Sequence, residues 1–141
     1  MASVLGAIQT QLATDITTTS IDKTYLGFVE STPSTYPYAE IHMGGGEIGY
    51  NITSQIDVET GFEVYIYGTS MEQVQLAIEE ITALWFSAAK RLVLAGLGVI
   101  NILPVSPYPP IVYAPSSATT ATTQRPLMGA LTFEMTVRYT V

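Results

Sequence analysis

The chain has 141 residues, of which 48% are hydrophobic and 12% are charged. Twelve acidic residues against five basic ones give a net charge of −7, which opposes binding to nucleic-acid phosphates. The absence of cysteine excludes disulfides and thiolate metal sites. The length fits a single domain, residues 1–141, that buries about two thirds of its unfolded surface. The sequence shows no signal peptide or long apolar run, so we expect no contact with a membrane.

The first expected element is a short N-terminal helix. Apolar residues recur at helical spacing from Val4 to Leu12, and Ser3 is a suitable N-cap. We expect this helix to end near Ala13 and to pack with its apolar side on a sheet. Residues 17–24 are rich in Thr and Ser and are expected to form a connector.

The next segment is expected to be extended, with turns at its glycines. A brief extended piece is expected over residues 25–29. A strand is expected over 36–43, whose proline cannot donate to a ladder and must lie at a strand start or edge. The glycines at 44–46 permit a turn with positive φ, after which 47–58 should be extended with a bend or bulge. A second turn at 59–61 would complete two successive hairpins.

The clearest pattern is a strand followed directly by a helix. Apolar and polar residues alternate over 62–67, which is typical of a half-buried strand. Ser70 and Gln73 form a capping-box pattern, so one long helix is expected over about 70–91. The side chains expected to form its buried stripe are Val74, Ala77, Ile78, Ile81, Leu84, Trp85 and Ala88.

The region after this helix contains shorter elements and a low-complexity stretch. Glycines within 95–98 are expected to end the helix, and 99–105 is expected to be a strand as far as Pro104. The proline-rich residues 106–110 should run extended on the surface toward 111–113. Residues 114–126 are small and polar, so we expect a long flexible loop.

The C-terminal segment is the most regular strand pattern in the chain. Apolar and polar residues alternate from Leu131 to Val141, and this strand is expected to lie beside 62–67 because both present an apolar face to the long helix. The predicted fold is therefore α+β, with a mixed, mainly antiparallel sheet covered by the long helix and the short N-terminal helix.

No pattern of catalytic or metal-binding residues is evident. His42 is the chain's one histidine and lies within a strand pattern, where a polar surface residue or a hydrogen-bonded residue is more common than a ligand or a catalytic group. Glu79 and Glu80 are adjacent on a helix and point about 100° apart, which is unsuitable for a cooperating acid pair. The glycines at 44–46 lack the lysine and following helix of a phosphate loop. We therefore expect neither an enzyme nor a bound cofactor or metal.

The layout as a whole resembles the tail terminator and tail-completion proteins of long-tailed bacteriophages. The resemblance is carried by the strand and helix of 62–90, the final alternating strand 131–141, the short N-terminal helix and the ProTyr-containing strand. It is a resemblance of layout and size, without an invariant motif. A related ring protein of the neck or tail tube, or a small α+β binding domain or enzyme, is the alternative.

The resemblance implies a structural virion protein in the tail or neck, assembled in the host cytoplasm. It would form a homohexameric ring that caps the tail tube, ends tube growth and joins the head-completion proteins. DNA would pass through the lumen without sequence-specific binding. In similar proteins a long loop orders against the tube, and the matching segment here is 114–126. Its candidate interaction residues are Ser116, Thr119, Thr120, Thr122, Thr123, Gln124 and Arg125.

Overall fold

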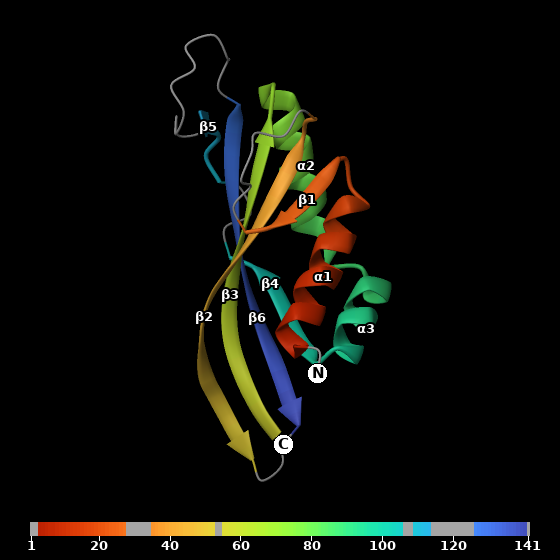
Figure 1. Ribbon diagram of the computed structural model, residues 1–141, viewed down its shortest axis with the longest axis vertical. Coiled ribbons are helices and arrows are strands. Elements are labelled where there is room, and N and C mark those ends of the chain that lie inside the picture. Colours follow the sequence, from red (N-terminus) through yellow and green to blue (C-terminus); the bar gives the residue numbers. More distant parts are fainter. Residues whose placement is uncertain (1–2, 28–34, 53–54, 106–108, 114–125, 141) are drawn as a thin grey trace.

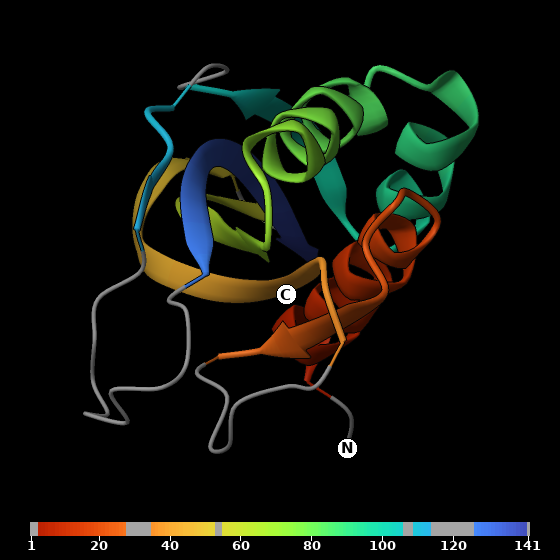
Figure 2. The same cartoon turned by 90° about the horizontal axis from the view of Figure 1, so that it is seen from above.

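The computed structural model describes residues 3–27, 35–52, 55–105, 109–113 and 126–140. Within these residues, three helices lie on one face of a six-stranded mixed sheet, and the other face is open (Figures 1 and 2). The elements in chain order are α1 (Val4–Thr17), β1 (Lys23–Leu26), β2 (Tyr38–Ile52), β3 (Gln55–Gly68), α2 (Met71–Leu84), α3 (Ala88–Gly96), β4 (Val99–Pro104), β5 (Val112–Tyr113) and β6 (Leu127–Thr140).

The strand order in the sheet is β1-β2-β3-β6-β4, and β5 also pairs with β6. Among these pairs, β1–β2 is parallel and the others are antiparallel. The predicted α+β class is confirmed.

The predicted passage from β3 into a capped helix is confirmed. The Ser70 hydroxyl accepts from the Gln73 amide at 3.2 Å, and the Gln73 side chain accepts from the Thr69 amide at 2.8 Å. These bonds satisfy backbone groups that have no partner inside the first turn. The expected apolar stripe is buried from Val74 to Trp85.

The single long helix expected over 70–91 is wrong, because the structure has two helices there. α2 ends at Leu84, and Ser87 then caps α3 by accepting from the Lys90 amide at 3.5 Å. The Arg91 Nε donates to the carbonyl of Trp85, so a cation satisfies a carbonyl left over at the end of α2. Ala88 consequently opens a new helix and is exposed, instead of extending the buried stripe.

α1 begins at Val4 as predicted but continues to Thr17, one turn beyond the expected end. The additional turn buries Ile16 and also Asp15, whose carboxylate accepts from Trp85 Nε1 at 2.9 Å and Gln11 Nε2 at 3.0 Å. A buried carboxylate is tolerated when such donors surround it. Asp15 therefore links α1 to the end of α2.

The two successive hairpins are also wrong, because β2 and β3 form one long hairpin. The glycines expected to turn at 44–46 lie within β2, and residues 59–61 lie within β3. The register shifts between Met43 and Gly46, which marks a bulge. A Cβ on Gly44 would lie 2.9 Å from the Gly61 carbonyl oxygen, so Gly44 is needed for close approach between strands and not for a turn. The proline predicted at a strand start, Pro37, does precede β2, after a cis peptide bond.

The predicted pairing of the last strand with β3 is confirmed, with Phe62 opposite Phe133. These two rings stack at a centroid distance of 5.0 Å, and Trp85 of the helix layer meets Phe133 edge-on at 5.1 Å. This contact joins the sheet to the helices at the centre of the core. Beyond the helices, the distal parts of β2, β3 and β6 extend as a long arm (Figure 1).

The shorter elements agree in part with expectation. β4 matches the predicted strand to Pro104, and Gly98 before it has a φ of 105°, a conformation that favours glycine. β1 covers only the beginning of the extended piece expected at 25–29. Residues 28 and 29, most of the proline-rich segment and the expected flexible loop up to residue 125 lie outside the described residues.

Candidate interaction surfaces

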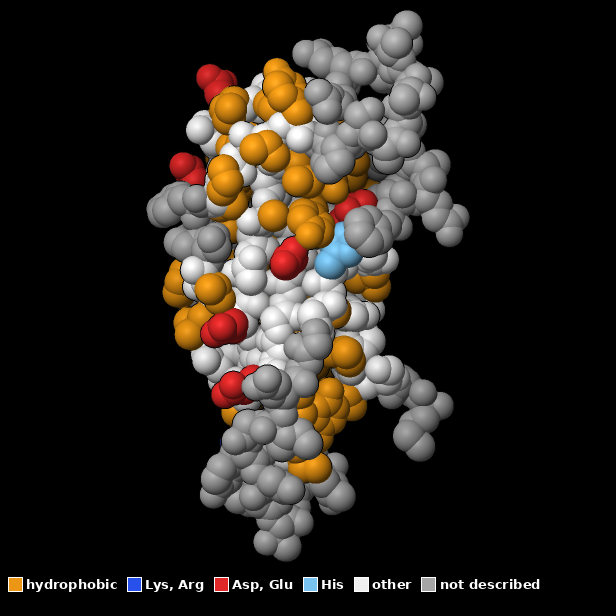
Figure 3. Space-filling model, turned by 90° about the vertical axis from the view of Figure 1, so that its left-hand side faces the viewer, with side chains coloured by type: hydrophobic (Ala, Val, Ile, Leu, Met, Phe, Trp, Pro, Cys, Tyr) orange, Lys and Arg blue, Asp and Glu red, His pale blue; other side chains and the backbone are white. Residues whose placement is uncertain are grey.

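The interaction residues expected from the sequence, 116–125, lie outside the described residues, so their role stays a prediction. The described residues instead present three surfaces: a tyrosine surface and an acidic surface on the open face of the sheet, and an apolar flank formed by α3 and β4. Figure 3 shows the open face, with hydrophobic side chains gathered over its upper half and acidic side chains along its left margin and across its middle.

The tyrosine surface consists of Tyr25, Tyr36, Tyr38, Tyr65 and Tyr67. Strand register brings them together, because Tyr38 pairs with Tyr67 across β2 and β3, and Tyr25 of β1 follows on the same face. The Tyr38 and Tyr67 rings stack at 4.7 Å, while Tyr25 and Tyr36 lie 5.9 and 5.4 Å from Tyr38. Stacked and edge-on rings stabilise a sheet face beyond simple burial.

A buried carboxylate lies beside these rings. Glu40 is only 4% exposed, and its Oε1 accepts from the Tyr67 hydroxyl at 3.2 Å and lies 3.1 Å from His42 Nε2. The His42 ring also meets Tyr65 edge-on at 4.8 Å. His42 thus lies within β2 and is hydrogen-bonded to Glu40. Glu40 and His42 fix the positions of the surrounding rings.

Three phenols of this surface, those of Tyr38, Tyr65 and Tyr67, have a raised pKa. Burial, followed by neighbouring Tyr36 and Glu40, raises the pKa of Tyr38 to about 12. Burial and Glu40 also raise the pKa of Tyr67. The hydrogen bond from the Tyr65 hydroxyl to Glu63 Oε2, at 2.5 Å, raises the pKa of Tyr65. The Tyr65 hydroxyl donates to Glu63 and the Tyr67 hydroxyl donates to Glu40, so both phenols act as protonated donors.

The lower half of the open face carries the acidic surface: Asp57, Glu59, Glu63 and Glu134. Arg138 pairs with one member of this group, since its Nε and Nη2 donate to the two Asp57 oxygens at 2.8 and 2.9 Å. This fork of hydrogen bonds lowers the pKa of Asp57. The remaining carboxylates make this part of the face predominantly negative.

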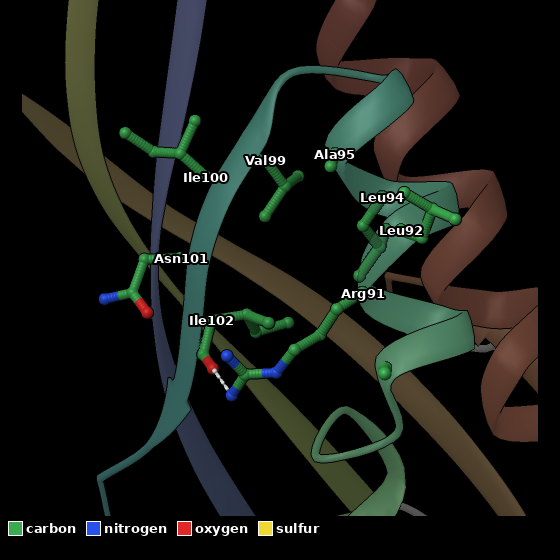
Figure 4. A pocket seen from close by; sticks show the side chains of 9 residues that line it. Arg91, Leu92, Leu94, Ala95, Val99, Ile100, Asn101 and Ile102 are labelled. Carbon is green, nitrogen blue, oxygen red and sulfur yellow. Dashed lines mark hydrogen bonds between the residues drawn. The ribbon is translucent and has the colours of Figure 1, made fainter.

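The apolar flank surrounds a pocket of about 500 Å³ between α3 and β4 (Figure 4). Its walls are mainly aliphatic, and Val99 points from β4 toward α3. Arg91 crosses the pocket and donates through Nη2 to the Ile102 carbonyl at 3.1 Å. Because a second bond from the same side chain reaches the end of α2, Arg91 holds α2, α3 and β4 together.

The outer edge of β4 is closed to a further strand. The Val105 amide points toward β6 and donates to the Thr132 carbonyl. Because the backbone groups of successive residues in a strand point to opposite sides, the Ile102 carbonyl points away from β6, where it accepts a hydrogen bond from Arg91. Pro104 has no amide to donate, and the register shift between Val99 and Asn101 interrupts the ladder. Such features prevent edge pairing, so side chains must provide any contact here.

Large apolar side chains remain exposed at both edges of the sheet and on the helix layer. Leu92 of α3 is 74% exposed and Phe86, between α2 and α3, is 59% exposed. Ile100 and Leu103 of β4 are also exposed, and Leu26 is exposed on β1 at the opposite edge of the sheet. Exposed apolar patches of this kind mark contact sites for other proteins.

The described part of the chain contains no group of three or more His, Cys, Asp or Glu residues placed to hold a metal ion. None of its helices has the length and apolar character required to traverse a bilayer. No protein-family model matches the chain, and a search of curated proteins gives no match.

The sequence analysis predicted none of these three surfaces. The alternation over 62–67 predicted a half-buried strand, and therefore a second face for Tyr65 and Tyr67, but the partners of those rings depend on strand register. The flank depends on the break between α2 and α3. Ser87, a good N-cap inside a helical pattern, was the available signal for that break.

Proposed function

We propose that the chain is a structural subunit of a ring at the end of a phage tail, capping the tail tube and joining it to the neck. The observation that carries this proposal is the exposure of large apolar side chains at both edges of the sheet, Leu26 on β1 and Leu103 on β4. Different surfaces on opposite flanks suit head-to-tail association of identical subunits, which closes into a ring when the rotation permits.

The charge of the open sheet face supports the same proposal. If the acidic surface faces the lumen of the ring, its carboxylates repel phosphates and allow DNA to pass without being retained. Glu59 and Glu134 are exposed members of this surface, whereas the charge of Asp57 is balanced by Arg138. The resemblance in layout supplies the rest of the proposal: a hexamer in the virion, with the tail-tube protein and a head-completion protein as partners.

The direct test is the growth of tail tubes in the presence of the purified chain. Tubes assembled from the tube protein of the phage that encodes this chain should stop growing, and electron microscopy should show a ring at one end. A Leu26→Asp, Leu92→Asp variant is the control, because both side chains are exposed and the core is untouched. It should fold but fail to cap tubes. Unchanged tube length with the wild-type chain would refute the proposal.

A further inference from the structure

The pocket between α3 and β4 is apolar except for one cation. Among the described residues that line it, Arg91 is the charged one, and α3 and β4 contain no acidic residue. Val99 and Ile102 point from β4 toward α3, whereas Ile100 and Asn101 point away from it (Figure 4). The inner walls are therefore aliphatic, and Arg91 is the charged group that a molecule in the pocket meets.

The guanidinium of Arg91 is fixed by its contacts but is not neutralised by them. Its Nε and Nη2 donate to the carbonyls of Trp85 and Ile102, and its Cζ lies over the Phe86 ring, 5.8 Å from the ring centroid. Its Nη1 donates to no described residue, and no described carboxylate pairs with Arg91. The pocket thus contains a preorganised cation with unused donors, for which a carboxylate has the complementary charge and geometry.

The remainder of a matching ligand must be apolar. An extended polypeptide would bring amide and carbonyl groups that need partners. The outer edge of β4 does not provide a row of partners, because Pro104 has no amide and Arg91 already occupies the Ile102 carbonyl. The buried side chains of Leu94, Val99 and Ile102 fit an alkyl chain instead. The volume of about 500 Å³ lies within the range of small-molecule sites, about 300–1,000 Å³.

We infer that this pocket binds a small aliphatic carboxylate. The carboxylate accepts from Arg91 Nη1, and the alkyl chain lies between α3 and β4. Ala88 and Ala95 both line the pocket and lie about 10 Å apart along the helix, a span that suits a chain of medium length such as octanoate. Leu92 also lines the pocket and is 74% exposed, so binding covers part of its side chain. This ligand site is independent of the proposed ring.

NMR titration of the isotope-labelled chain with octanoate tests the site. Octanoate should shift the amide signals of α3 and β4 in a saturable manner. Octan-1-ol has the same alkyl chain without the charge and should bind about tenfold more weakly, because it cannot form charge-assisted hydrogen bonds with Arg91. Octylammonium carries the opposite charge and should not produce these shifts. Equal binding of octanoate and octan-1-ol, or the absence of saturable shifts in α3 and β4, would overturn the inference.

Variants distinguish recognition by Arg91 from its structural contacts. Ala95→Phe fills the pocket without altering Arg91 and should weaken octanoate binding by about tenfold or more. Ala89→Phe is the matched control, because Ala89 is exposed on the same helix and does not line the pocket; its octanoate binding should equal that of the wild-type chain. Arg91→Gln should bind octanoate and octan-1-ol about equally, whereas loss of the fold would abolish binding of both.

Circular dichroism should show that the Ala89→Phe and Ala95→Phe variants are folded. Octanoate binding that is unchanged in Ala95→Phe, or that is weakened equally in Ala89→Phe, would place the ligand outside the pocket and contradict the inference. A folded Arg91→Gln variant that still prefers octanoate to octan-1-ol would show that Arg91 does not recognise the carboxylate.

Discussion

The two faces of the sheet are completed in different ways. On the helix-covered face, Phe62 and Phe133 stack on each other and Trp85 closes over them, so these apolar side chains are buried within one chain. On the open face, Tyr38 and Tyr67 also stack, but a buried carboxylate and hydrogen bonds hold the rings in place. The same strands are thus stabilised by close packing of apolar side chains on one face and by hydrogen bonds between polar groups on the other.

The two regions are also expected to have different roles, one in the stability of the single chain and the other in its association with further copies. The helix-covered face needs nothing beyond this chain, whereas the edges of the sheet and the outer sides of α2 and α3 leave apolar residues exposed. Substitutions in the first region should therefore change stability, and substitutions in the second should change association.

The largest loss of stability is expected for Phe133→Ala. The phenyl ring is buried against Phe62 and Trp85, and its removal leaves a cavity between sheet and helices, at a cost of about 3–5 kcal/mol. Chemical denaturation would measure this change. Thr132→Ala, one residue away on the open face, is the control and should cost far less. Equal losses would contradict the assignment of the two faces.

A somewhat smaller loss is expected for Ile81→Ala in the buried stripe of α2. Lost burial and a cavity should cost about 2–5 kcal/mol. Glu79→Ala lies on the exposed side of the same helix and should change the free energy of unfolding by less than about 0.5 kcal/mol. Comparable effects of the two substitutions would show that the helix is oriented differently.

These elements are also the ones that the sequence predicts well, because their signals are local. The Ser70 cap, the spacing of Val74 and Ile81, and the alternation around Phe133 each define an element without knowledge of its partners. The predictions are wrong where a contact between residues distant in the sequence determines the local structure. Gly44 resembles a turn residue until Gly61 is found opposite it, and the continuous helical pattern through Ser87 conceals a break that Arg91 supports from α3.

On the open face, Glu40→Ala should destabilise the protein by about 1–3 kcal/mol, because the Tyr67 hydroxyl loses its buried acceptor. Glu40→Gln retains an acceptor oxygen and should cost less. Thermal and chemical denaturation of both variants would measure the difference. If the two variants were equally stable, the hydrogen bond would not be what stabilises this surface.

The tyrosine surface should also respond to alkaline pH. The pKa of Tyr38 is raised to about 12 in the folded state, so its contribution to stability is fully present below the ordinary value near 10 and is lost as pH rises toward 12. Ultraviolet absorbance of phenolate should reveal late-titrating tyrosines, and Tyr38→Phe should remove one of them while Tyr67 still titrates late. Ionisation of all tyrosines near the ordinary pKa would contradict the described burial.

The smallest effect is expected for the exposed pair of Asp57 and Arg138. The Arg138→Gln substitution should return the pKa of Asp57 upward toward its ordinary value, as measured by NMR titration. Because Arg138 lowers this pKa, the pair stabilises the fold above the unfolded pKa of Asp, and the contribution disappears as pH falls through the folded pKa. High salt should reduce the effect, since the pair is accessible to solvent. A pKa unaffected by the substitution would mean that the fork of hydrogen bonds does not persist in solution.

The central claim is that the apolar side chains exposed on one chain are covered by further copies of the same chain. Native mass spectrometry of the wild-type chain, over a range of protein concentrations, tests this claim most directly. The proposed function predicts a closed ring of defined size, a hexamer on the strength of the resemblance, whose population falls as the protein is diluted. A monomer at every concentration, both free and in the presence of tail tubes, would contradict it.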